Sequence, residues 1–331
     1  MKNAAAVKPK RDNVCLRTLR SINDNYNILY VLIGLFVILS FAATDVFLTP
    51  TNLFNVLRQV SMVSIVSVGI FFTLVGGGID LSCGTAAGFV GIFFSDLIVN
   101  KGVNPYAAIV LGVGMGALVG LVNGTLISYC HLAPFIATVG TMSICQGLSL
   151  LWTNSYPVLD LPASIEYIGR GWLFGVPFPL YLVLIVYIAA FIVTSKTKYG
   201  RYLYCAGGNA EAAYLSGIDV KKVQFLSYVI CGALTAVASI ILCGRLDSAQ
   251  PANGASWDFD AITACVLGGT SLAGGKGNIL GALLGALFVG ILGNGMTLLG
   301  VNSNVQTIAK GVVLVIAVWI DTARNLRANK V

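Results

Sequence analysis

Histidine is almost absent from this sequence, and its scarcity removes several kinds of active site. The 331 residues include one histidine, His131. A catalytic triad needs an imidazole held beside two other groups, and many zinc sites need several histidines. A single histidine cannot supply a zinc site with several histidines, and the chain offers no other imidazole for a catalytic triad. We therefore expect no catalytic residue, no metal site and no cofactor in the chain.

The chain also lacks any CxxC pair, although it has eight cysteines. They are scattered through apolar and loop segments instead of being grouped as a disulfide framework or a metal site would require. A free cysteine behaves as a small apolar residue. We expect free thiols that serve packing at Cys15, Cys83, Cys130, Cys145, Cys205, Cys231, Cys243 and Cys265.

Charged residues are scarce as well. They make up 10% of the chain, whereas 57% is hydrophobic and the mean hydropathy is +0.86. A soluble domain carries about 25% charged residues. The composition therefore indicates an integral membrane protein, and the 38 glycines fit transmembrane helices that pack closely together.

What charge there is has a biased placement. The net charge is +7, and 14 of the 20 Lys and Arg residues lie in three segments: 1–26, 196–222 and 323–331. Basic residues beside membrane helices accumulate in the cytoplasm. The bias thus reports topology and gives no reason to expect a nucleic-acid partner. It places both termini and residues 196–222, here called the coupling segment, on the cytoplasmic side.

Long apolar runs predict an all-α polytopic membrane protein with about ten transmembrane helices. A crossing needs about 20 apolar residues, and an even number of crossings returns the chain to the cytoplasm. We expect one transmembrane domain over 27–322, between cytoplasmic tails at 1–26 and 323–331, with external stretches at 45–55, 153–179 and 244–260. The expected crossings are 26–43, 60–75, 86–99, 106–129, 135–152, 180–194, 223–243, 261–272, 280–299 and 305–320.

Glycines mark two further features. In the fourth expected crossing they recur with a period of four, at Gly112, Gly116, Gly120 and Gly124, which predicts a helix face for close packing. Elsewhere they break the apolar runs at 76–82 and at 268–277. Each break is either a turn or a re-entrant, discontinuous helix.

The coupling segment contains a predicted short helix. Asn209 can cap its start, Glu211 suits the positive end of its dipole, and Gly217 can take a left-handed stop. Small residues at 210, 212, 213 and 216 would present a smooth surface to a groove on a partner. An ordinary solvated connector is the alternative interpretation.

Several motifs, in the same order along the chain, resemble the membrane subunits of ribose/galactose-type ABC sugar importers. The matching residues are 78–82, 134–138 with 140–142, 200–204, 207–209, 212–213, 216–218, 260–262 and 266–277. Departures from the pattern at Cys83, Thr263 and Phe259 leave the family resemblance intact. They weaken the inference about which sugar is the substrate.

This resemblance implies an importer subunit in a bacterial plasma (inner) membrane. The implied substrate is a monosaccharide, and a ribose-like sugar is the first candidate. The implied partners are a cytoplasmic ATP-binding subunit, an external sugar-binding protein and a second permease subunit, identical or related, all within membrane lipid. The short helix would sit on the ATPase. The residues implied in coupling are Gly208, Asn209, Glu211, Ala212, Ala213, Ser216 and Gly217.

Four polar residues at the glycine breaks are candidates for the substrate pathway: Asp80, Ser82, Thr270 and Ser271. An acid at the centre of a membrane helix costs roughly 2.5–3.5 kcal/mol on insertion scales unless it is paired or wet. Asp80 therefore either lines the pathway or accepts hydrogen bonds from backbone N–H groups that residues 76–78 set free. The three hydroxyls either line the pathway or bond to their own helix backbone.

The polar stretch 245–260 is either a wet external loop or a docking surface for the sugar-binding protein, with Gln250, Asn253 and Trp257 as candidates. Lys310 is expected to extend its amine toward the membrane surface.

The glycines at 268–277 do not form a phosphate loop, because Thr270 replaces the first glycine of GxxxxGK[ST] and Gly277 follows Lys276. The rival function is an ion-driven secondary transporter, which would need intramembrane acids. Asp80 is the one good candidate for such an acid, while Asp96 lies near a helix end.

Overall fold

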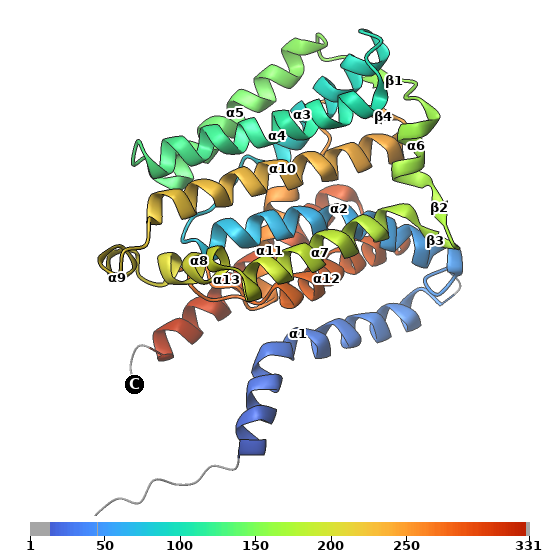
Figure 1. The fold of residues 1–331 in the computed structure, drawn as a ribbon. Coiled ribbons are helices and arrows are strands. Elements are labelled where there is room, and N and C mark those ends of the chain that lie inside the picture. Colours follow the sequence, from blue (N-terminus) through green and yellow to red (C-terminus); the bar gives the residue numbers. More distant parts are fainter. Residues whose placement is uncertain (1–13, 45, 329–331) are drawn as a thin grey trace, which may run out of the picture.

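The structure, a computed structural model, describes residues 14–44 and 46–328, with side chains placed for 28–44 and 46–323. Half of the expected N-terminal tail and the end of the C-terminal tail lie outside the described residues. Within the described part of the chain the fold is helical (Figure 1). The helices are α1 (Val14–Ala42), α2 (Pro50–Val75), α3 (Cys83–Val99), α4 (Pro105–Ser128), α5 (Pro134–Trp152), α6 (Ala163–Arg170), α7 (Phe178–Lys196), α8 (Lys198–Gly208), α9 (Ala210–Leu215), α10 (Val220–Leu246), α11 (Trp257–Leu267), α12 (Ile279–Leu298) and α13 (Ser303–Ala328).

Four two-residue strands lie at one end of the helices (Figure 1). They form two antiparallel pairs: β1 (Val158–Leu159) with β4 (Ser248–Ala249), and β2 (Trp172–Leu173) with β3 (Val176–Pro177). The stretch 153–179, expected to be a loop, therefore contains α6 and three strands. The pairing of β1 with β4 ties this stretch to the polar segment that precedes α11.

Seven helices of the described chain are long and apolar enough to cross a membrane: α2, α4, α5, α7, α10, α12 and residues 303–323 of α13. Residues 28–42 of α1 and the whole of α3 are shorter apolar helices. The expected crossing at 261–272 overlaps α11, which has 11 residues. At 1.5 Å per residue α11 is about 16 Å long, roughly half the hydrocarbon core. The helical class is confirmed, whereas α11 by itself cannot be a complete crossing.

Prolines begin several of these helices. Pro50, Pro105 and Pro134 are the first residues of α2, α4 and α5. Proline suits this position, because its ring presets the helical φ and its missing N–H would have no partner there. Thr49 and Asn104 cap α2 and α4 by accepting hydrogen bonds from backbone N–H groups of the first turn.

The glycines of α4 pack against α10, as their spacing predicts. A methyl group added at Gly116 or Gly120 would overlap the backbone of α10, at Gly232 and Tyr228 respectively. At Gly124 it would lie 2.8 Å from the Phe225 carbonyl oxygen. Backbone approach this close needs glycine, so α4 and α10 form a tightly packed pair.

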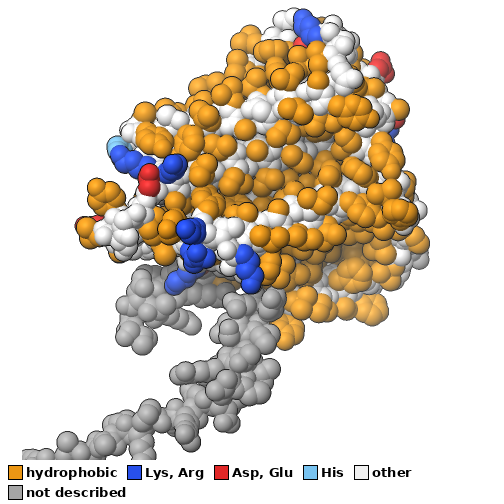
Figure 2. Space-filling view, in the orientation of Figure 1, with side chains coloured by type: hydrophobic (Ala, Val, Ile, Leu, Met, Phe, Trp, Pro, Cys, Tyr) orange, Lys and Arg blue, Asp and Glu red, His pale blue; other side chains and the backbone are white. Residues whose placement is uncertain are grey.

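The surface in Figure 2 is largely hydrophobic along the sides of the helices. The Lys and Arg side chains seen in this view gather mainly at the end that carries α8 and α9. Such a distribution fits helices surrounded by lipid with a basic face toward the cytoplasm. The seven cysteines with placed side chains are all free, as expected.

Candidate transport pathway and coupling segment

The glycine break after α2 leads into a buried polar network. The Asp80 carboxylate accepts hydrogen bonds from the Ser82 backbone N–H (2.9 Å) and the Ser82 hydroxyl (2.6 Å). The Asn123 amide of α4 donates to the Ser82 hydroxyl oxygen at 2.9 Å. Asp80, Ser82 and Asn123 are all at most 2% exposed. The network therefore fixes the start of α3 to α4.

The donors to Asp80 differ from those expected. The N–H groups of Gly76, Gly77 and Gly78 donate to carbonyls of α2 instead. They complete the end of that helix with a left-handed turn at Gly77 (φ +81°). Ser82 takes their place because it follows Asp80 by two residues, a spacing at which an aspartate bonds its own backbone.

The first interrupted segment passes beside the middle of α10. The Tyr228 hydroxyl of α10 donates to the Ile79 carbonyl at 3.2 Å, and the Ser239 hydroxyl donates to the Ala87 carbonyl at 2.5 Å. Because Tyr228 and Ser239 flank the centre of the 27-residue α10, α3 begins near mid-depth. Residues 76–82, which are not helical, cover the depth between the end of α2 and the start of α3. The first break is therefore a discontinuous span rather than a surface turn.

The second interruption precedes α11. A methyl group added at Gly84, in the first turn of α3, would lie 2.8 Å from the Gly254 carbonyl oxygen and 3.2 Å from Oδ1 of Asp258. At Gly88 it would lie 2.6 Å from the Pro251 carbonyl oxygen. The stretch before α11 thus runs alongside α3 toward mid-depth, where the first turns of α3 and α11 face each other.

This geometry corrects two candidates for external docking. Asn253 and Trp257 are each 8% exposed, buried among the elements around α3. Because their side chains are enclosed, they cannot form the surface expected of them. Gln250 is exposed and remains available for docking. A wet loop throughout 245–260 is also wrong, because the stretch turns inward after β4.

A cavity of about 250 Å³ opens where α3, α5 and α11 approach one another. Its lining combines apolar groups with hydroxyls, amides and one carboxylate. We call it the central cavity, and it is lined by Leu81, Gly84, Thr85, Met142, Gln146, Pro251, Ala252, Asn253, Ala255, Ser256, Asp258 and Phe259.

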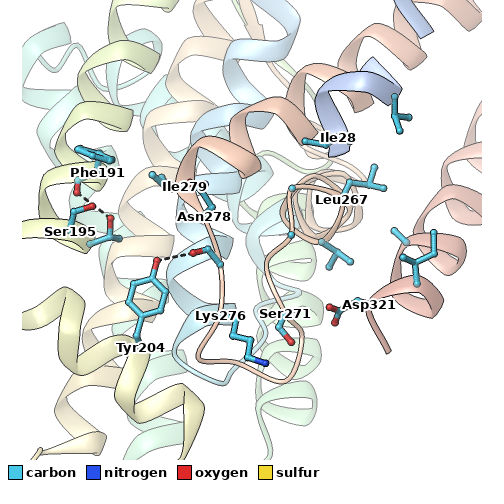
Figure 3. A pocket seen from close by; sticks show the side chains of 18 residues that line it. Ile28, Phe191, Ser195, Tyr204, Leu267, Ser271, Lys276, Asn278, Ile279 and Asp321 are labelled. Atoms are coloured by element: carbon cyan, nitrogen blue, oxygen red, sulfur yellow. Dashed lines mark hydrogen bonds between the residues drawn. The ribbon is translucent and has the colours of Figure 1, made fainter. Parts of the chain in front are cut away.

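Thr270 and Ser271 lie away from the central cavity. Both are buried, at 0% and 3% exposure, and the Thr270 hydroxyl has no hydrogen-bond partner. Ser271 lines a second cavity of about 710 Å³ near the coupling segment, with Lys276 and Asp321 also on its wall (Figure 3). The four expected pathway residues therefore form two separate pairs: Asp80 with Ser82, and Thr270 with Ser271.

The second cavity is closed on one side by α8. The Tyr204 hydroxyl donates to the Gly277 carbonyl at 3.0 Å (Figure 3). Burial raises the pKa of the Tyr204 phenol, so the hydroxyl keeps its proton and stays a donor near neutral pH. This bond joins the coupling segment to the loop between α11 and α12.

Lys310 forms an ion pair instead of extending outward. Its Nζ lies 2.7 Å from Oδ2 of Asp260. The Asp260 side chain is 9% exposed and that of Lys310 is 31% exposed. The pair joins α13 to α11, and the partial burial of both charges matches the expectation that intramembrane charges pair with each other.

The short helix of the coupling segment is present as α9. Asn209 caps it by accepting a hydrogen bond from the Ala212 N–H at 2.9 Å, and Gly217 takes a positive φ of +82°. Gly208, Asn209, Glu211, Ala212, Ser216 and Gly217 are exposed.

One residue of the expected smooth surface faces the other way. Ala213 is 4% exposed, because it packs against the rest of the chain. Its expected place on the docking face is wrong. In contrast, Tyr214 and Leu215 are 72% and 79% exposed. Sequence reasoning missed these two residues, although two adjacent large apolar side chains in a short loop helix are a visible signal.

Glycines join the coupling segment to both breaks. A methyl group added at Gly207 would overlap the Val75 carbonyl oxygen, and one at Gly274 would lie 2.9 Å from the Gly77 Cα. The Gly275 N–H donates to the Val75 carbonyl at 3.0 Å. We call the five residues Gly77, Gly207, Gly208, Gly274 and Gly275 the glycine joint. It brings the end of α8, the end of α2 and the loop after α11 into backbone contact.

The sequence as a whole matches a known family. A profile of the family described as "Branched-chain amino acid transport system / permease component" covers residues 52–318. The match spans most of the chain. The chain belongs to this permease family. Both interrupted segments and the glycine joint of the permease lie within the matched residues.

Individual relatives are permeases for sugars. The chain is 41% identical to a ribose import permease of Bacillus subtilis (strain 168), over 88% of this chain and 92% of the relative. It is 41% identical to that of Escherichia coli (strain K12), over 89% and 93%. A D-allose transport permease of the same strain is 32% identical, over 90% and 91%. No solved structure gave a significant match.

Proposed function

We propose that the chain is the transmembrane subunit of an ATP-driven importer that moves a monosaccharide, ribose-like first, into the cytoplasm. The observation that carries this proposal is 41% identity to ribose import permeases over nearly the full length of both chains. The family description names branched-chain amino acids, but the relatives compared are sugar permeases. We infer the substrate from the individual relatives, because their names specify a substrate more narrowly than the family description does.

The permease is proposed to cross a bacterial inner membrane ten times, with both termini and the coupling segment in the cytoplasm. Seven long apolar helices supply most of the crossings. The others are the apolar part of α1 and two interrupted segments, 76–99 and 247–267. In this scheme the termini form the cytoplasmic tails 1–26 and 323–331. ATP hydrolysis is assigned to a separate subunit, and a second permease, identical or related, completes the pathway.

Movement is proposed to pass from the ATPase to the pathway through the glycine joint. Tyr214 and Leu215 would enter a groove on the ATPase, together with the exposed small residues of α9. A shift of α9 then reaches Gly207 directly through α8. From there it reaches the end of α2, which precedes Asp80, and the loop that follows α11. Packed glycine backbones transmit displacement because no flexible side chain lies between them.

Within the pathway the expected residues are proposed to have different roles. Asp80 and Ser82 hold the break before α3 in shape, which their mutual hydrogen bonds favour. Thr270 and Ser271 lie nearer the cytoplasmic exit, where Ser271 reaches the second cavity. Gln250 is proposed to contact the sugar-binding protein outside.

An ion-driven transporter is the less favoured alternative. Asp80 is already bonded within the chain, and Asp260 is paired with Lys310. The relatives, moreover, include import permeases for ribose and for galactose/methyl galactoside.

Reconstitution distinguishes the two mechanisms. The permease is placed in proteoliposomes with its ATPase, and the sugar-binding protein and ribose are supplied outside. We expect ribose uptake that requires ATP inside and continues when ionophores collapse the H⁺ and Na⁺ gradients. Uptake that continues without ATP but stops with the ionophores would overturn the proposal.

A further inference from the structure

Three arginines meet at the end of the molecule that carries the strands. Arg58 of α2 donates from one Nη to the Arg170 carbonyl at 2.9 Å, and Arg170 donates from Nε to the Arg245 carbonyl at 2.6 Å. Arg170 ends α6, and Arg245 lies in the last turn of α10. The last carbonyls of a helix favour cations. Capping therefore accounts for the position of two of the three guanidinium groups.

The positive charge of this cluster is only partly balanced. Arg170 pairs with Glu166 at 3.5 Å, but both side chains are well exposed and such a pair is weak. Asp247 accepts a hydrogen bond from the Leu161 N–H at 3.0 Å instead of pairing with an arginine. Among the described residues the half-buried Arg245 guanidinium makes no hydrogen bond and no ion pair. The cluster thus has positive charge and N–H donors to offer an anion.

The position of the cluster is unusual for this chain. Six Lys and Arg residues lie outside the three basic segments, and the three arginines of the cluster are half of them. The charge bias of the chain places this end of the molecule outside the cytoplasm, where basic residues beside membrane helices are scarce. Arginine is the side chain best suited to recognise a phosphate or carboxylate group. Its concentration here points to an anionic ligand.

An apolar groove of about 590 Å³ lies beside the cluster. It is lined by α4, α6, α7 and α10, and its walls include Ile109, Val113, Leu182 and Ile240. The helices α4 and α7 also carry large apolar side chains that are exposed, as expected of helices surrounded by lipid. The groove therefore offers an apolar surface that suits an acyl chain.

Tyr167 of α6 joins the groove to the cluster. Its ring lines the groove and lies 5.3 Å from the Phe178 ring, and its hydroxyl donates to the Trp172 carbonyl at 3.1 Å. The Arg58 guanidinium carbon lies 4.7 Å from the centre of the Trp172 ring, which is a cation–π contact. Trp and Tyr concentrate at the level of lipid head groups. Near α6 and β2 (Figure 1) the chain thus combines an acyl-chain groove, interfacial aromatic rings and a basic cluster.

We propose that Arg58, Arg170 and Arg245 bind the phosphate of an anionic phospholipid of the outer leaflet, while the groove holds one of its acyl chains. Phosphatidylglycerol fits this description, because its head group brings negative charge and no ammonium toward the arginines. Because α6 supplies both Tyr167 and Arg170, the bound lipid holds α6 against the end of α10. Such binding goes beyond import and is independent of which sugar the permease carries.

Native mass spectrometry of the full-length permease with added phosphatidylglycerol tests the head-group contact. Arg245→Gln removes one positive charge without removing a hydrogen bond made by the described residues. Lys101→Gln is the matched control, because Lys101 is an exposed basic residue in the loop between α3 and α4, outside the cluster. We expect Arg245→Gln to weaken binding about fivefold, the change that corresponds to about 1 kcal/mol per basic residue near anionic lipid. Equal affinities in the two variants would overturn the inference.

A second pair of variants tests the groove. Ser164→Trp fills it from α6, whereas Ala163→Trp adds the same side chain at an exposed neighbouring position that does not line it. We expect the first variant alone to lose phosphatidylglycerol binding while keeping the unaltered melting temperature in lipid-free detergent. Dioleoylglycerol, which has no phosphate, should bind Arg245→Gln and the unaltered permease equally.

Two other occupants are distinguished by the same variants. If Ser164→Trp separates a pair of permeases while lipid binding is unchanged, the groove belongs to a second copy. If Arg245→Gln weakens docking of the sugar-binding protein while lipid binding is unchanged, the arginines belong to that partner. Either result would overturn lipid binding at this site.

Discussion

Asp80 illustrates how one buried acid is accommodated in an apolar segment. Its carboxylate is 2% exposed and accepts two hydrogen bonds from Ser82, whose hydroxyl in turn accepts one from Asn123. Hydrogen bonds to a charged group contribute about 1.5–3 kcal/mol each. We therefore propose that Asp80 holds an interrupted segment in one conformation.

We predict that Asp80→Ala impairs ribose transport more than Asp96→Ala does. The first change leaves Ser82 without its acceptor at mid-depth, at a cost of about 1–3 kcal/mol. Asp96, which is 8% exposed, accepts from Asn100 and Trp152 near the end of α3, away from both interruptions. Transport and thermal unfolding in detergent are measured at matched membrane abundance. Normal transport by Asp80→Ala would contradict both the structural and the pathway role of this residue.

At the scale of elements, α9 shows which face of the coupling segment is available to a partner. Ala213 faces inward, so Ala213→Arg would disturb the segment itself and would not report on docking. Tyr214 and Leu215 project outward from the same short helix. Large apolar side chains at the centre of an interface supply most of its affinity.

Replacing Tyr214 and Leu215 together with serine should therefore release the ATPase. We expect the variant to insert normally but to lose most of the ATPase on affinity purification, with transport falling in proportion. Ala210→Ser, which keeps a small side chain on the same helix, is the control and should retain both. Co-purification of the ATPase at the unaltered ratio would mean that α9 is an ordinary connector.

The glycine joint gives a second prediction at this scale. In Gly207→Ala the new methyl group overlaps the Val75 carbonyl oxygen, so the end of α8 must move away from α2. We expect the complex to assemble and hydrolyse ATP while importing less sugar per ATP. Gly140→Ala, with nothing within 4 Å of the added methyl group, is the matched control. Equal sugar-to-ATP ratios in the two variants would remove the joint from the mechanism.

At the scale of the whole molecule, the proposal of ten crossings counts two interrupted segments beside the apolar part of α1 and the seven long apolar helices. The α3 and α11 segments each combine a short helix with non-helical chain. Non-helical backbone is tolerated at membrane depth where protein buries it or a cavity hydrates it. Residues 80–82 are buried by protein, and the stretch before α11 borders the central cavity.

Sidedness is tested by labelling engineered cysteines with a membrane-impermeant maleimide. Ala163→Cys on α6 and Ala210→Cys on α9 are both at exposed positions. The exposed Cys130 and Cys205 are first replaced by serine. We expect Ala163→Cys to react in intact spheroplasts and Ala210→Cys to react after permeabilisation. Reaction of Ala210→Cys from outside would contradict the ten-crossing topology.

The sequence by itself determined the class of the molecule, the extent of most helices and the packing face of α4. These features depend on local quantities: apolar run length and glycine at a period of four. The positions of Asn209 and Gly217 likewise predicted α9, because a cap and a left-handed stop act on neighbouring residues. The family motifs of the chain were also visible without the fold.

Tertiary structure alone decided which polar residues share a site. Asn253 and Trp257 looked external because the stretch around them is polar, yet contact with Gly84 and Gly88 of α3 draws that stretch inward. The pairing of Lys310 with Asp260 depends on a neighbour 50 residues away along the chain. Periodicity describes one element at a time. Burial is set by the elements packed against it, and those positions follow from long-range contacts that no local pattern encodes.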